Sequence, residues 1–297
     1  MLTSGPQTPS PSLPPLCYNE VIMNKKRLVK KAIMAVTAVI LAMTLYGCKA
    51  SPQPVNAVKD DSLQKVLDSK QLVIGLDDSY PPMGFRDETG EIVGFDIDVA
   101  NEVCDRLGIT LVKQPIDWDK KEEELNSGAI DCIWNGMSVT PERAEAMTLS
   151  EPYLKNTLIF IVTERSDAKG LRDLKGKTIG VQSGSTVVDA LKSSSIISDI
   201  TVAEYNDNTK LVEELSRGKV DAILIDSIAA YYFIFSGNDK FYVLSDSISE
   251  EECAIGFRKG DLSLHDKIQE IISEMKADGS LGKISTKWFG TDITIVR

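Results

Sequence analysis

The sequence predicts an α/β protein of two similar lobes, each built on a mostly parallel sheet flanked by helices. Strands and helices alternate along the chain, and the body of about 240 residues is too long for one compact core. A helix–glycine–strand unit also occurs twice, at residues 124–133 and 214–223, with a constant offset of 90 residues. A shorter similarity occurs earlier in each half: residues 73–75 and residues 178–180 both have the pattern of a strand ending near a glycine. We therefore expect a duplicated body.

The N-terminal region has the composition of a targeting segment. Residues 1–22 are rich in Pro and Ser and show no periodicity, so we expect a disordered or non-native extension. Met23 is a plausible second start, followed by five basic residues and an apolar run at residues 32–46 that is short for a membrane span. The run ends at Leu45-Tyr46-Gly47-Cys48, which resembles the lipobox of bacterial lipoproteins.

That resemblance implies a signal peptide at residues 23–47, cleavage before Cys48 and a lipid on its thiol. Residues 48–61 would then form a polar tether, and the body would be exported and held at a membrane surface. A hydrophobic anchor that is never cleaved is the alternative, and it places the body in the same compartment.

Charge and cysteine usage exclude several classes of protein. Without residues 1–47 the chain has 28 basic and 43 acidic residues, a net charge of −15 that disfavours a nucleic-acid partner. Cys104, Cys132 and Cys253 show no C-x-x-C spacing, so no zinc site is indicated; the first two read as core residues, and a single disulfide stays open. His265 is the single histidine of the sequence, and we expect it on the surface. A histidine-based catalytic triad or a His-rich metal site is therefore not indicated.

Hydrophobic patterning places the elements of the first lobe. A short helix at residues 63–67 precedes a strand at 71–76, and a helix at 96–107 carries one apolar face. The remaining elements are a strand at 109–113, a helix around 122–125 and a strand at 132–134.

A strongly apolar strand at residues 157–163 is long enough to leave one lobe for the next. The following elements are strands at 178–181, 201–205 and 220–225, helices at 187–192, 209–217 and 226–235, a returning strand at 253–258 and a helix at 264–277. We assign residues 62–162 and 254–297 to the first lobe and residues 163–253 to the second.

A helix start with an unusual cation follows the first repeat. Thr140 is placed to cap this helix and Pro141 occupies its first position. Acidic residues are usual in the first turn of a helix, so a basic residue such as Arg143 is unusual there. A cation beside the free backbone N–H groups of a helix start can bind a small carboxylate. The alternative is a solvated arginine paired with Glu142 or Glu145, which would contribute little.

In mostly parallel sheets, ligands gather outside the carboxyl ends of the strands. The residues that follow strands are therefore the candidates: Asp77, Tyr80, residues 135–138, residues 182–186 and Asp226. Both aspartates also have a purely structural alternative: Asp226 can equally be the N-cap of the next helix, and Asp77 can simply be a turn residue.

Taken together, these residues resemble the solute-binding proteins of polar amino acid ABC transporters, the bacterial extracellular solute-binding protein family 3. The resemblance covers residues 72–290, and its specificity lies in the order of several motifs. These are Ile74-Gly75-Leu76-Asp77 with Tyr80-Pro81-Pro82, Gly94-Phe95-Asp96-Ile97-Asp98, Ser138-Val139-Thr140-Pro141-Glu142-Arg143, and residues 180–186. It implies the two-lobed type II periplasmic-binding-protein fold with a two-strand hinge.

The resemblance also implies roles for the candidate residues. Arg143 would hold the ligand α-carboxylate with backbone N–H groups of Ser138 and Thr186, and Asp226 would receive the α-ammonium. The whole implied ligand-binding set is Asp77, Tyr80, Trp118, Asn135, Gly136, Ser138, Arg143, Gln182, Ser185, Thr186 and Asp226. Tyr80 and Trp118 would sandwich the ligand side chain, whereas Asp77, Asn135 and Gln182 would read its polar end. For both aromatic residues, core or rim packing is the alternative.

The expected function is delivery of a polar amino acid to the permease of an ABC importer by ligand-induced lobe closure. A cystine or basic amino acid binder is the alternative within the family, and a dehydratase-like enzyme on this fold is the alternative outside it. We expect no catalytic residue, cofactor or metal, and a monomer tethered through Cys48. A sensory module would need a further domain, and the chain ends at Arg297.

Overall fold

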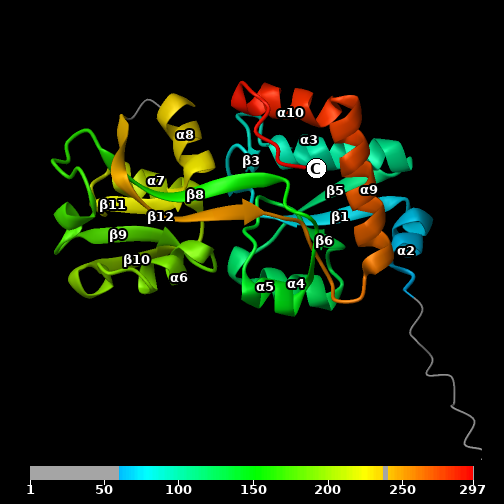
Figure 1. Cartoon of the computed structure of the whole chain (residues 1–297), viewed down its shortest axis with the longest axis horizontal. Coiled ribbons are helices and arrows are strands. Elements are labelled where there is room, and N and C mark those ends of the chain that lie inside the picture. Colours follow the sequence, from blue (N-terminus) through cyan, green and yellow to red (C-terminus); the bar gives the residue numbers. More distant parts are fainter. Residues whose placement is uncertain (1–59, 237–239, 297) are drawn as a thin grey trace, which may run out of the picture. The chain divides into compact units, whose positions relative to one another are not determined.

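The computed structural model describes residues 60–236 and 240–296 (Figure 1). The elements up to the first crossing strand are α2 (Ser62–Ser69), β1 (Gln71–Leu76), β2 (Ser79–Tyr80), β3 (Gly84–Arg86), β4 (Ile92–Val93), α3 (Phe95–Leu107), β5 (Thr110–Pro115), α4 (Lys121–Ser127), β6 (Cys132–Ile133), α5 (Pro141–Ala146), β7 (Thr148–Leu149) and β8 (Leu154–Thr163). The remaining elements are β9 (Thr178–Gln182), α6 (Thr186–Lys192), β10 (Thr201–Tyr205), α7 (Asn208–Ser216), β11 (Ala222–Asp226), α8 (Ser227–Ser236), β12 (Phe241–Cys253), β13 (Gly256–Phe257), α9 (Leu262–Asp278) and α10 (Ser280–Phe289). Short 3-10 helices at Trp118–Lys120, Leu171–Leu174 and Ile197–Asp199 join them.

Two five-stranded sheets have the same plan. Their strand orders are β5-β1-β6-β13-β7 and β10-β9-β11-β8-β12. In each sheet the first three strands are parallel, the fourth is antiparallel to both of its neighbours, and the fifth therefore returns to the direction of the first three. The predicted α/β fold with two mostly parallel sheets is confirmed. The strand directions repeat at all five positions, and the three parallel strands follow the same relative chain order in both sheets.

Two long strands, β8 and β12, connect the sheets and pair antiparallel with each other from Leu154–Cys253 to Thr163–Phe241 (Figure 1). Both are hydrogen-bonded within the second sheet. The lobe boundary that we assigned at residues 162 and 163 therefore falls at the far end of β8. A boundary near residues 153 and 253 fits this pairing better.

The repeated unit has the same local chemistry in both lobes. Gly128 and Gly218 follow their helices with φ of 82° and 69°, a backbone conformation that favours glycine. The carboxylates of Asp131 and Asp221 each accept a 2.8 Å hydrogen bond from the neighbouring parallel strand, from the backbone N–H of Val73 in β1 and of Thr178 in β9. Each repeat thus anchors its buried strand in the same way.

Four features of the structure depart from the sequence expectations. The predicted strand at 253–258 is confirmed only in part, because Cys253 ends β12 and the returning strand β13 holds only Gly256–Phe257. The rest of β12 was also missed. It begins with the apolar run Phe241-Tyr242-Val243-Leu244, but it continues into polar residues and the acidic stretch 250–252, which has no strand-like apolar pattern. The helix α10 and the small sheet β2-β3-β4 were also missed.

His265 lies on α9 and is half-buried, with 18% of its side chain exposed, rather than fully on the surface. Its Nε2 lies 3.1 Å from the Leu149 carbonyl oxygen, and its ring packs edge-on against Phe257 at 5.4 Å between centroids. Cys104, Cys132 and Cys253 are all buried and free, so the disulfide left open by the sequence is not formed. Within residues 60–236 and 240–296, no helix has the length and apolarity needed to cross a membrane.

Candidate functional site

Ten of the eleven predicted ligand-binding residues line one inner cavity. They come from both lobes, and the cavity has a volume of 20 Å³, about that of one water molecule. Its lining consists of Tyr80, Trp118, Asn135, Gly136, Ser138, Arg143, Gln182, Ser185, Thr186 and Asp226. The eleventh residue, Asp77, is hydrogen-bonded to two of them.

Arg143 is held at the start of α5 as its sequence context predicts. Pro141 is the first helical residue, and the Thr140 hydroxyl accepts a 3.1 Å bond from the Arg143 backbone N–H. The side chain is not a solvated surface arginine: Arg143 is only 7% exposed. Its Nη1 donates to the Ser138 carbonyl at 2.7 Å, and its Nη2 donates across to the Gly184 carbonyl of the second lobe at 3.4 Å.

The guanidinium keeps its capacity to bind an anion. It carries five N–H donors, and the two bonds to carbonyls leave others for a planar carboxylate. Burial lowers the pKa of Arg143, whereas the charges of Glu251, Glu122 and Asp226 act in the opposite direction. An arginine remains charged under such a shift, so the site presents a fixed cation.

Asp226 ends β11 and reaches the cavity from the second lobe. Its carboxylate accepts hydrogen bonds from the Asn156 amide and the Tyr80 hydroxyl. Burial, and next the charge of Glu251, raises the pKa of Asp226 to about 7, and the bonds from Tyr80 and Asn156 oppose this rise. Near neutral pH this carboxyl is therefore poised to ionise when a cation arrives.

The polar end of the site is a hydrogen-bonded chain between the lobes. The Asp77 carboxylate accepts bonds from the Ser79 backbone and hydroxyl at 2.8 and 2.6 Å and from Gln182 Nε2 at 2.5 Å. Asp77 thus forms the turn that was its alternative role and also contacts the second lobe. Gln182 Oε1 accepts in turn from Asn208 at 2.9 Å, a residue that the sequence did not single out.

Asn135 lines the cavity and carries a buried amide donor, which packs against Gly84. Its Oδ1 accepts a 3.1 Å bond from the Asp77 backbone N–H, which fixes the amide orientation. Its buried Nδ2 has no hydrogen-bond partner among the residues described. Since leaving a buried donor unpaired costs about 1–3 kcal/mol, an acceptor on a ligand would stabilise this group.

The two aromatic residues combine packing with exposure to the cavity. Trp118 is 8% exposed and packs on the core around Leu125, Ile133 and Met147, as the packing alternative predicts, while it also lines the cavity. Tyr80 lies so close to Gly136 that a Cβ there would be 2.9 Å from the Tyr80 ring. The aromatic ring and the strand-end loop therefore fit only with glycine at position 136.

A buried carboxyl supports the loop after β6. Asp96 accepts bonds from the Gly136 N–H at 2.6 Å and the Tyr153 hydroxyl at 3.0 Å, and burial raises its pKa to about 7. From the sequence, Asp96 was only part of a helix start. Its sole signal was an acidic residue in the first turn of α3, which is common in helices.

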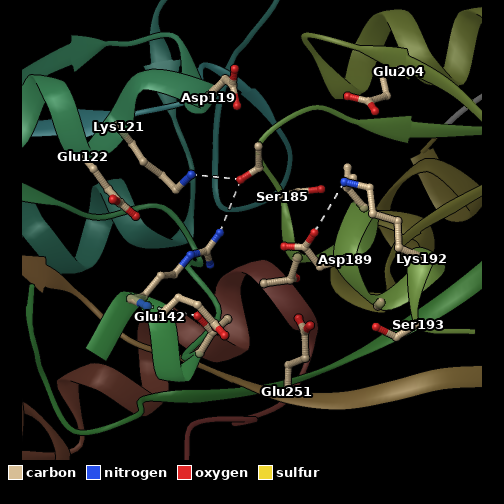
Figure 2. A pocket seen from close by; sticks show the side chains of 16 residues that line it. Asp119, Lys121, Glu122, Glu142, Ser185, Asp189, Lys192, Ser193, Glu204 and Glu251 are labelled. Atoms are coloured by element: carbon tan, nitrogen blue, oxygen red, sulfur yellow. Dashed lines mark hydrogen bonds and ion pairs between the residues drawn. The ribbon is translucent and has the colours of Figure 1, made fainter. Parts of the chain in front are cut away.

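An outer cavity of 710 Å³ adjoins the inner one and shares Arg143, Ser185 and Thr186 with it. Figure 2 shows Lys121 and Glu251 approaching this cavity from different sides. Lys121 Nζ donates to the Gly184 carbonyl across the lobes at 2.9 Å and to the Trp118 carbonyl at 3.0 Å. Burial, and next the Arg143 charge, lowers the pKa of Lys121 to about 8.

Lys121, Asn156 and Glu251 were missed by sequence reasoning. Lys121 had no pattern beyond its place in a helix, and Glu251 lies in an acidic run that resembles a solvated surface. Asn156 is brought to Asp226 only because β8 pairs with β11. No cluster of His, Cys, Asp or Glu able to hold a metal ion occurs among the described residues.

Comparisons with known proteins agree with this architecture. The family of bacterial extracellular solute-binding proteins, family 3, matches residues 72–291. The L-cystine-binding protein TcyJ of Escherichia coli is 30% identical over 275 residues, which cover 92% of this chain and 100% of the relative. The arginine-binding extracellular protein ArtP of Bacillus subtilis is 30% identical over 263 residues, covering 88% and 98%.

A solved structure shows the same fold. The ABC uptake transporter substrate-binding protein of Streptococcus pneumoniae with bound histidine is 35% identical and superposes with a TM-score of 0.76. The match covers 80% of this chain and 99% of that one. The chain therefore belongs to family 3 of the bacterial extracellular solute-binding proteins and has their two-lobed type II periplasmic-binding fold.

Proposed function

We propose that this protein binds one free polar amino acid between its lobes and presents it to the permease of an ABC importer. The observation that carries the proposal is the convergence of Arg143 from the first lobe and Asp226 from the second on one buried cavity. A zwitterion needs one fixed cation and one fixed anion, and here each comes from a different lobe. The relatives named above bind cystine, arginine and histidine, which supports this class of ligand.

The two ends of the amino acid have separate partners in this proposal. Arg143 holds the α-carboxylate in a bidentate arrangement, with Ser185 and Thr186 at the start of α6 closing over it. Asp226 receives the α-ammonium, with Gly136 and Ser138 around it. Tyr80 and Trp118 contact the side chain.

Lobe closure couples binding to recognition by the permease. Gln182 to Asp77 and Lys121 to Gly184 are direct bonds between the lobes, and the inner cavity has only 20 Å³. An amino acid must therefore part these side chains, and the lobes must separate to admit it. Because ligand contacts are divided between the lobes, binding favours the closed form by the contacts that form only when both lobes reach the ligand.

The polar end of the site favours a ligand side chain with a hydrogen-bond acceptor. The Asp77 carboxylate already accepts three bonds, whereas Asn135 Nδ2 is an unused buried donor among the described residues. An amide, an imidazole nitrogen or the second carboxylate of cystine would pair with Asn135. Basic amino acids are the alternative, and they require Asp77 to exchange Gln182 for the ligand.

A thermal-shift panel tests the ligand class. The panel holds the twenty amino acids, cystine and ornithine, and a true ligand should raise stability by about 2.7 kcal/mol at a hundredfold excess over its dissociation constant. We expect glutamine, histidine or cystine to exceed lysine and ornithine. A panel without any responder refutes amino acid binding, whereas a response to lysine and ornithine alone refutes the preference for an acceptor.

Binding without turnover separates this function from a dehydratase-like enzyme on the same fold. Such an enzyme needs a positioned acid or base besides the groups that hold the zwitterion. After prolonged incubation of the protein with its responding amino acid, we expect mass spectrometry to recover only the unchanged ligand. A new product would establish catalysis.

We further propose that the protein is a monomer tethered outside the cytoplasm by a lipid on Cys48. The lipobox-like sequence Leu45-Tyr46-Gly47-Cys48, which lies outside the described residues, supports the tether. When the gene for the full chain is expressed in bacteria with a labelled fatty acid, the label should appear in the membrane fraction on the processed chain that begins at Cys48. Cys48→Ala should abolish the label, and an equally labelled variant would refute this site.

A further inference from the structure

A second carboxylate faces the proposed ammonium site from the hinge. Glu251 on β12 lies directly opposite Asn156 on β8 in the antiparallel register of the two crossing strands. Its Oε2 accepts a 2.6 Å bond from the Ser138 hydroxyl of the first lobe and lies 3.5 Å from Asn156 Nδ2. Glu251 also lines the outer cavity, where its side chain points inward (Figure 2).

The same amide nitrogen serves both acidic residues. Asn156 Nδ2 donates to Asp226 Oδ1 as well as to Glu251 Oε2. Two carboxylates that share one donor repel each other, and the charge of Glu251 helps to raise the pKa of Asp226. A cation beside the pair would relieve this repulsion.

No basic side chain within the described residues supplies that cation at close range. Ion pairs within 4.0 Å join many surface residues, but none in the described part of the chain includes Asp226 or Glu251. Arg143 acts on both carboxylates through space, while its hydrogen bonds go to the Ser138 and Gly184 carbonyls. The other titratable groups that face the pair are Tyr80, Cys253 and, beyond Arg143, Glu122.

We propose that Glu251 is a second ammonium-binding carboxylate, and that with Asp226 it encloses the α-ammonium of the ligand at the hinge. This inference rests on the proposed function and adds a residue to it. An ammonium has three N–H donors, so it can bond both carboxylates and still reach a third acceptor. Through Glu251 the ligand contacts the crossing strand β12, and Ser138 ties that contact to the first lobe.

The test compares Glu251→Gln with Glu250→Gln. Glu250 is the adjacent residue of the same strand and carries the same charge, so it is a matched control. Calorimetric titration uses L-histidine, L-arginine and L-cystine as probes. Loss of one charge-assisted bond should raise the dissociation constant of the binding probe roughly 10- to 100-fold for Glu251→Gln and less than about twofold for Glu250→Gln.

Two further readouts separate a direct contact from a structural role. Wild-type affinity should rise as pH rises through about 7, because Asp226 must ionise to receive the ammonium. In Glu251→Gln this rise should move to lower pH, since the like charge is gone. The ligand-free variant at pH 8 should be at least as stable as wild type, because the repulsion is removed.

The outcomes distinguish the two proposals. Unchanged affinity in Glu251→Gln while Arg143→Ala loses binding overturns the role of Glu251 and leaves amino acid binding standing. Weakened affinity with an unshifted pH profile also overturns the role of Glu251, because the substitution has then disturbed the local structure without changing the charge that acts on Asp226. Should the glutamine variant fail to fold, Glu251→Asp keeps the charge and must show intermediate affinity with the wild-type pH profile. A wild-type protein that binds none of these probes and no member of the thermal-shift panel refutes the proposed function itself.

Discussion

The two repeats of the body share their scaffold and differ in the charge that they present. Asp131 bonds the backbone of Val73 on β1, and Asp221 bonds the backbone of Thr178 on β9, each at 2.8 Å. The Asp131 and Asp221 backbone N–H groups return bonds to the same two residues at 2.7 and 2.8 Å. A duplicated framework therefore holds β6 and β11 in equivalent places.

Beyond those strands the repeats diverge. After β6 the chain forms a loop through Gly136 before α5, which places the cation of Arg143 at the cavity. At the position equivalent to Gly136, 90 residues later, the second repeat has Asp226 and enters α8 directly. One framework can thus place opposite charges when only the residues after its strands change, which is what a zwitterion requires.

Loss of the cation should have the strongest consequence. Arg143→Ala should weaken amino acid binding more than about 100-fold, since a buried charge-assisted bidentate contact is lost. Arg143→Lys should recover only part of this loss, because an ammonium cannot form the planar pair. Calorimetric titration checks both variants, and circular dichroism controls for folding. Unchanged affinity in the alanine variant would rule out the role assigned to Arg143.

The anion of the second repeat comes next. Asp226→Asn should weaken binding roughly 10- to 100-fold. The variant should also alter the pH dependence of ligand-free stability. The pKa of Asp226 is about 7 in the folded protein and 3.8 ordinarily, so the folded state holds an extra proton between these values. Raising pH through this window therefore destabilises the fold.

Urea unfolding of the ligand-free protein at several pH values measures this contribution to stability. Asp226→Asn should flatten the decline in stability between about pH 4 and pH 7. Asp96, whose pKa is also about 7, should preserve a second decline of the same sign. A variant profile that superposes on wild type would refute the coupling assigned to Asp226.

The position where the repeats diverge gives the third prediction. Gly136 has φ of 57°, and a Cβ there would lie 2.9 Å from the Tyr80 ring. Gly136→Ala should therefore cost more than about 1 kcal/mol of stability and also weaken binding. Gly128→Ala is the control, because it has positive φ and open space around it. A stability loss without an affinity loss at position 136 would separate Tyr80 from the site.

The shared scaffold should respond most weakly. Asp131→Asn and Asp221→Asn should each reduce the free energy of unfolding by about 1 kcal/mol and leave ligand affinity within about twofold. Urea titration measures the stabilities. Similar losses support equivalent roles for the two aspartates. A loss confined to one variant would show that only one repeat depends on this bond.

Short-range patterns explain how much could be predicted. The glycine-ended helices, the apolar strands and the cap formed by Thr140 are local features, and from the sequence alone they place Arg143 at a helix start. The contacts of Glu251, Asn156 and Lys121 depend on strand register and lobe packing, to which residues far apart in sequence contribute. The length of β12 was hidden because its polar residues are stabilised by pairing with β8 rather than by burial.

A crystal structure with the strongest ligand of the thermal-shift panel would show directly whether the two repeats divide a zwitterion between them. We predict the ligand α-carboxylate on Arg143 and the α-ammonium on Asp226, within the cavity lined by Tyr80 and Trp118. An amino acid bound with its α-groups away from both charged side chains would be incompatible with this division.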